Sequence, residues 1–63
     1  MRINVYIKEY EGAEYELTVG NRPVADEAEA GQVGTYFIAN AMYAGAVDGY
    51  WDWAEDSAPS PTN

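Results

Sequence analysis

The fold is decided by the stretch RINVYIK at residues 2–8. Apolar side chains recur there at every second position, so an extended chain has one apolar face and one polar face. A second alternating stretch lies at residues 13–19, and Gly12 between the two suits the left-handed position of a hairpin loop. The sequence therefore predicts a β-hairpin with strands at about 2–10 and 13–19.

The register of this hairpin follows from the need to bring the two apolar faces together. A three-residue loop over residues 10–12 meets that need. The expected partners are Ile7 with Tyr15, Val5 with Leu17, Ile3 with Val19 and, on the outer face, Lys8 with Glu14. The last of these is a favourable cross-strand charge pair.

An apolar stripe with helical spacing predicts one helix at about residues 30–45. Asp26 followed three residues later by Glu29 has the pattern of a helix start, because acidic side chains in a first turn suit the helix dipole. Gly31 and Gly34 each cost about 1 kcal/mol in a helix relative to alanine, so both residues disfavour its first turn.

The segment GYWDWA at residues 49–54 alternates again and predicts a third strand, with a helical turn as the alternative. A strand that returns from the helix would lie antiparallel to the first strand, which gives the strand order 2-1-3. The predicted fold class is α+β, a hairpin packed on one helix. It forms a single domain over residues 1–56 with a frayed tail at 57–63.

The residue types that the chain lacks exclude most kinds of catalytic and metal-binding site. The chain has 63 residues with no Cys and no His, so it can form neither a disulfide nor a Cys/His zinc site. The usual pairs of nucleophile and base cannot be built, and a domain of this size has little room for a pocket. We therefore expect no enzyme activity and no cofactor. The acidic clusters lack the ligand spacing of an EF-hand, so no metal site is expected either.

Charge is the dominant property of the chain. Eleven acidic residues face three basic ones, which gives a net charge of −8. Such a surface repels nucleic acid and anionic membranes and attracts basic surfaces. No apolar run has the length of a membrane span or the pattern of a signal peptide. These features predict a cytoplasmic protein, monomeric or dimeric, that binds a basic protein and does not itself bind nucleic acid or membrane.

The expected partner-binding residues are acids in two clusters together with aromatic anchors. The anchors are expected because Trp and Tyr are enriched at the centres of interfaces, although the two tryptophans could instead close the small core. The predicted contacts are Asp26, Glu27, Glu29, Asp48, Tyr50, Asp52, Trp53, Glu55 and Asp56.

A short chain without Cys, an acidic run without bases at residues 48–56 and interleaved Tyr and Trp resemble the small phage-encoded DNA mimics, in particular the anti-CRISPR proteins. The resemblance lies in composition and size. It implies an inhibitor that occupies the DNA-binding site of a bacterial defence complex, such as a subunit of a CRISPR surveillance complex, in the cytoplasm of the host cell.

Two other functions stay open on the sequence. The chain could bind a host protein such as RNA polymerase through an aromatic patch, with its charge serving solubility. It could also be a structural or assembly protein whose oligomer buries the aromatic residues. Salt separates the first alternative from DNA mimicry, because ionic strength weakens an electrostatic contact far more than an apolar one.

Overall fold

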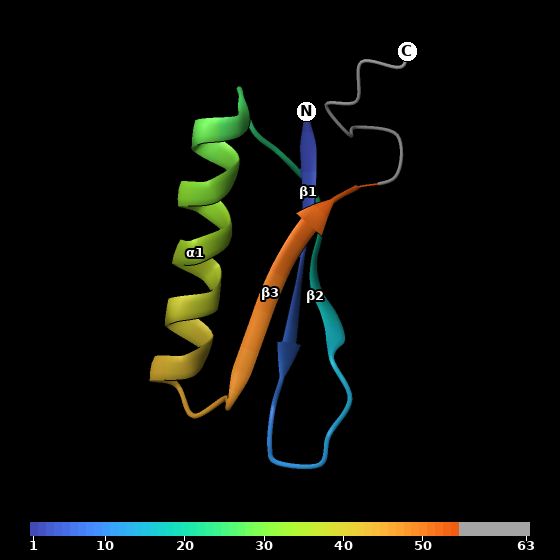
Figure 1. Cartoon of the computed structure of the whole chain (residues 1–63), viewed down its shortest axis with the longest axis vertical. Coiled ribbons are helices and arrows are strands. Elements are labelled where there is room, and N and C mark those ends of the chain that lie inside the picture. Colours follow the sequence, from blue (N-terminus) through green and yellow to red (C-terminus); the bar gives the residue numbers. More distant parts are fainter. Residues whose placement is uncertain (55–63) are drawn as a thin grey trace.

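Four elements follow one another along the chain (Figure 1). The computed structural model describes residues 1–54. The strands are β1 (Arg2–Lys8), β2 (Glu16–Pro23) and β3 (Asp48–Trp53), and helix α1 (Glu27–Tyr43) connects β2 to β3. The predicted α+β class is confirmed. The predicted tail at 57–63 lies outside the described residues.

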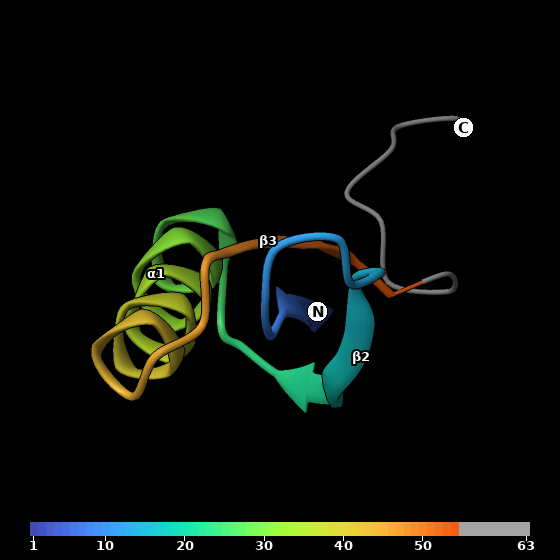
Figure 2. The ribbon, with the colours of Figure 1, turned by 90° about the horizontal axis from the view of Figure 1, so that it is seen from below.

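The strands form one antiparallel sheet in the order β2-β1-β3, as predicted. Viewed from below, α1 lies on one side of β1 and β2 lies on the other (Figure 2). The helix packs against β1 and β3. We call the sheet face that meets the helix the inner face. The opposite one, the outer face, is covered by no other element among residues 1–54.

The core lies between the inner face and α1. Ile3 and Val5 are fully buried there. Both tryptophans of β3 are partly buried against this core, in agreement with the alternative that they close it. Gly34 marks the closest approach of helix and sheet, because a Cβ atom at this position would lie 2.4 Å from the indole of Trp51. A larger residue would therefore push the helix off the sheet.

The predicted register of the hairpin is wrong. Instead of the pairs 7–15, 5–17 and 3–19, the structure pairs Ile7 with Glu16, Tyr6 with Leu17, Val5 with Val19 and Ile3 with Arg22. In two places β2 has one residue more than β1, as in β-bulges. Because of the first irregularity, Leu17 and Val19 point to opposite faces although they are two residues apart. Asn21 lies at the second irregularity, between the pairs of Val5 and Ile3. It has φ 52° and donates its N–H to the Oδ1 atom of Asn4 at 2.9 Å.

The hairpin loop is also longer than predicted, since β1 ends at Lys8 and β2 begins only at Glu16. Gly12 has φ 91°, in agreement with the left-handed position expected for it. The predicted pairing of Lys8 with Glu14 is wrong. With the longer loop, Lys8 forms its ion pair with Glu11 at 3.8 Å.

The helix begins earlier and ends earlier than predicted, at Glu27 and Tyr43 instead of about 30 and 45. Asp26 is its N-cap and accepts the N–H of Glu29 at 2.9 Å, while the Glu29 carboxylate accepts the N–H of Ala25. The Asp26 carboxylate satisfies a free N–H group of the first turn, and the Glu29 carboxylate satisfies the N–H of the residue that precedes the cap. This capping explains why the helix starts there despite the glycines that follow.

Candidate binding surface

A row of three side chains crosses the outer face of the sheet. Tyr6 on β1 lies opposite Leu17 on β2 and opposite Tyr50 on β3. The rings of Tyr6 and Tyr50 stack with their centroids 4.8 Å apart. Leu17 is 58% exposed and Tyr50 is 44% exposed. The alternation of side chains along the strands therefore places apolar residues in the core on the inner face and leaves an accessible aromatic surface on the outer face.

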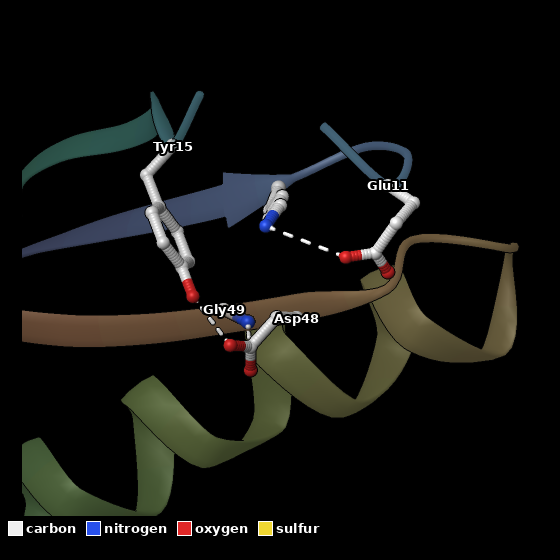
Figure 3. Close-up of polar contacts among 5 residues, drawn as sticks. Glu11, Tyr15, Asp48 and Gly49 are labelled. Carbon is white, nitrogen blue, oxygen red and sulfur yellow. Dashed lines mark hydrogen bonds and ion pairs between the residues drawn. The ribbon is translucent and has the colours of Figure 1, made fainter. Parts of the chain in front are cut away.

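Tyr15, from the hairpin loop, extends this row. Its ring meets that of Tyr50 edge to face, with centroids 5.0 Å apart. Its hydroxyl donates a hydrogen bond to the carboxylate of Asp48 (Figure 3). The ammonium group of Lys8 lies 5.9 Å from the centre of the Tyr15 ring, within the range of a cation–π contact. We call the group Tyr6, Tyr15, Leu17, Asp48, Tyr50 and Asp52 the tyrosine face.

The contact between Tyr15 and Asp48 shifts the pKa values of both. The pKa of Asp48 is lowered, first because its carboxylate accepts the Tyr15 hydroxyl and second because it accepts the backbone N–H of Gly49. The pKa of Tyr15 is raised, chiefly because the neutral hydroxyl donates that same bond. The pair is thus a neutral phenol against a charged carboxylate over the whole range around neutral pH.

The two aspartates of β3 also hold their own backbone. Asp48 accepts the N–H of Gly49 and Asp52 accepts the N–H of Trp53, each at 2.8 Å. The pairing of β3 with β1 turns these two N–H groups toward the unpaired edge of the sheet. Each carboxylate therefore covers one free edge donor and is fixed in orientation by doing so.

The structure divides the predicted contact residues into groups. Asp48, Tyr50 and Asp52 lie together on the outer face, as alternate residues of one strand. Asp26, Glu27 and Glu29 lie at the start of α1, the element on the inner face. Trp53 faces the core beside the paired Ile3. Glu55 and Asp56 lie outside the described residues.

Sequence reasoning missed three members of the tyrosine face, Tyr6, Tyr15 and Leu17. Leu17 was missed because the predicted register paired it with Val5 on the inner face, whereas it pairs with Tyr6. A signal for Tyr6 was present, because alternation along β1 and the strand order 2-1-3 together place it next to Tyr50. Tyr15 gave no such signal, since its contact with Asp48 spans 33 residues of sequence and depends on the length of the hairpin loop.

Few of the negative charges are neutralised within the domain. In residues 1–54 the one ion pair joins Lys8 to Glu11. Arg2 donates to the backbone oxygen of Asn21 at 3.0 Å, and the Arg22 guanidinium lies 5.5 Å from the ring centre of Phe37. Two of the three basic side chains therefore contact uncharged groups, and the negative charge of the acidic side chains is largely not neutralised within the described residues.

The described residues form no pocket and no group of three side chains suited to a metal ion. No helix within residues 1–54 has the length and hydropathy required to cross a bilayer. What the surface offers is a flat contact area with aromatic rings, oriented carboxylates and negative charge. Comparisons with protein-family models, with curated proteins and with solved structures give no significant match.

Proposed function

We propose that this chain is a DNA-mimicking inhibitor that binds the basic, arginine-containing site of a nucleic-acid-binding protein through its tyrosine face. The proposed target class is a bacterial defence complex of the kind that anti-CRISPR proteins inhibit. One observation carries the proposal. Aromatic rings and oriented carboxylates share an uncovered sheet face, in a chain with a net charge of −8.

The chemistry of this face suits arginine. A guanidinium group can donate two hydrogen bonds to a carboxylate, as it does to a phosphate, and it stacks on aromatic rings. Asp48 and Asp52 supply the first contact, and the rings of Tyr6 and Tyr50 supply the second. Lys8 over the ring of Tyr15 is an internal example of the same cation–aromatic contact. Sites that bind DNA are rich in arginine and lysine because they evolved for phosphates.

The carboxylates are oriented before any partner arrives. Asp48 is held by Tyr15 and Gly49, and Asp52 by Trp53. A side chain that is already fixed loses less conformational entropy on binding. Asp48 and Asp52 are four residues apart on one strand, which separates their Cα atoms by roughly 13 Å. Two charges held at a fixed separation can meet two basic side chains of a site that is shaped for the regularly spaced phosphates of DNA.

The runner-up is a protein that binds a host protein such as RNA polymerase mainly through apolar contact. The exposure of Leu17 and Tyr50 on the same face supports it. The two functions use the same surface but differ in what holds the partner, which is charge in the first case and aromatic burial in the second.

The test measures DNA binding by purified CRISPR surveillance complexes and restriction enzymes, with and without the domain, at two salt concentrations. A DNA mimic competes with duplex DNA for at least one of these targets, and its association rate falls as salt rises. Asp52→Asn should slow association, because it removes a charge from the tyrosine face and keeps the acceptor for Trp53. Glu27→Gln removes the same charge from the start of α1 and serves as the matched control.

Two outcomes contradict DNA mimicry. One is that DNA binding by every target is unaffected. The other is a tight complex that is insensitive to salt and to Asp52→Asn but is abolished by Tyr50→Ala, which would favour the apolar alternative.

A further inference from the structure

The helix carries an exposed stripe on the side opposite the sheet. Gln32, Tyr36, Ala39 and Tyr43 are all exposed and follow one another at intervals of four, three and four residues. This spacing places them on one line along a helix, turned away from the buried Ala30 and Gly34. Tyr36 is 64% exposed and Tyr43 is 95% exposed. We call these four residues the helix stripe.

The helix stripe lies in an uncharged part of an otherwise acidic chain. Residues 30–47 contain no charged side chain, although the whole chain has 14 charged residues among its 63. A second copy with the same net charge of −8 is repelled wherever carboxylates meet. On the stripe two copies can touch without bringing acids together.

We propose that two copies of this chain form a symmetric dimer by packing their helix stripes antiparallel. A twofold axis between Ala39 and Asn40, an exposed residue beside the stripe, brings the two tyrosines of one stripe against those of the other. It pairs Ala39 of each copy with Asn40 of the other, and Tyr36 of each with Tyr43 of the other. The small Ala39 lets the helices approach, and the tyrosines on either side of it can stack across the interface.

This arrangement keeps the acids of the two helix starts apart. Glu29, the acid of the helix nearest to the axis, lies about 10.5 residues from it, so the two copies of Glu29 are separated by roughly 32 Å along the helix at 1.5 Å per residue. Charges at that distance are largely screened, since the Debye length is about 10 Å at 0.1 M salt. The small core, which has six buried apolar residues within residues 1–54, also favours association, because small domains gain stability when they bury surface in an oligomer.

The proposed dimer uses the helix stripe, whereas the proposed function uses the tyrosine face. Its stripe lies on the far side of α1 from the sheet, so both tyrosine faces stay accessible. A dimer would therefore present two tyrosine faces to its targets. The contact is narrow compared with the roughly 800 Å² that each partner buries in a standard interface, so the dimer should dissociate on dilution.

The test is sedimentation equilibrium of the full chain over a range of concentrations. We expect the apparent mass to rise from 6.9 kDa toward twice that value. Ala39→Glu and Ala39→Lys each place two like charges next to the axis, and each should keep the chain monomeric with an unchanged circular dichroism spectrum. Mixed in equal amounts, the two variants should form a heterodimer, because the charges then attract.

Leu17→Glu is the matched control, since it adds the same charge on the tyrosine face and should leave the dimer intact. A chain that stays monomeric at millimolar concentration would overturn the proposal. So would a dimer that survives Ala39→Glu, or one that Leu17→Glu abolishes. None of these results bears on competition with DNA, so failure of the dimer and failure of the proposed function are distinguishable.

Discussion

The inner and outer faces of the sheet are built from the same strands, but apolar side chains are buried on the inner face and exposed on the outer face. On the inner face Ile3 and Val5 are 0% exposed. On the outer face Leu17 is 58% exposed and Tyr50 is 44% exposed. The inner face holds the domain together, while the outer face presents similar chemistry to solvent. Substitutions on the inner face should therefore change the stability of the fold, whereas substitutions of neighbouring residues on the outer face should change binding to a partner.

The largest effect is expected for Val5→Asp. An unpaired carboxylate would be buried between β1 and α1, which costs several kcal/mol where a domain of this size has only about 3–5 kcal/mol of stability. Circular dichroism should show an unfolded chain. Asn4→Asp, one residue away on the outer face, adds the same carboxylate and should leave the spectrum folded. A folded Val5→Asp variant would contradict the division of the two faces.

A second test compares two glycines of α1. Gly34→Ala adds a Cβ atom that would lie 2.4 Å from Trp51, and overpacking of this kind costs about 1–3 kcal/mol. Gly31→Ala adds the same atom where nothing lies within 4 Å and should stabilise the helix by up to about 1 kcal/mol. Chemical denaturation of both variants measures the difference. Equal stabilities would mean that α1 does not contact β3 as described.

On the outer face, Tyr50→Ala should preserve the fold. It removes the ring contacts with Tyr6 and Tyr15, and cross-strand pairs of this kind contribute about 0.2–1 kcal/mol each. Thermal melting should therefore show a small decrease in the melting temperature and a cooperative transition. A complete loss of structure would assign the tyrosines to the core of the fold instead of to a binding surface.

The smallest effect concerns pH and the bond between Tyr15 and Asp48. Because the pKa of Asp48 is lowered from 3.8, its contribution is present above that pH and is lost as the pH falls through the lowered value. Because the pKa of Tyr15 is raised from 10.0, its contribution is present below that pH and is lost as the pH rises through the raised value.

Melting curves of the wild type and Tyr15→Phe give the measurement. The difference in melting temperature should be constant near neutral pH and should shrink at both extremes. Tyr10→Phe, in the same loop, is the control and should show no such dependence. A difference that stays the same at pH 2 would show that the bond to Asp48 does not stabilise the fold.

Local patterns were sufficient to predict the elements but not how two of them pair. Alternation along residues 2–8 predicts β1 and both of its faces, and alternation along 49–54 predicts β3 beside it. The register of β2 could not be predicted, because the irregularity between Leu17 and Val19 adds one residue to that strand alone. An inserted residue of this kind leaves no mark in the spacing of apolar residues.

The candidate site was predictable to the extent that it lies on one strand. Asp48, Tyr50 and Asp52 share a face because alternate residues of a strand do. Asp26 and Glu29 were grouped with them by charge, but charge does not reveal that these two carboxylates cap a helix. Tyr15 joins the site only through tertiary folding.

The carboxylates that cover the edge of β3 also affect how the chain behaves in concentrated solution. An open strand edge with free N–H groups is a template on which other molecules can add strands and grow into fibrils. At neutral pH, Asp48 and Asp52 occupy two of these donors, and the negative charge keeps molecules apart. Strong acid weakens both the hydrogen bonds to these donors and the repulsion between molecules. Purification and storage near neutral pH should therefore keep the protein free of amyloid-like aggregates.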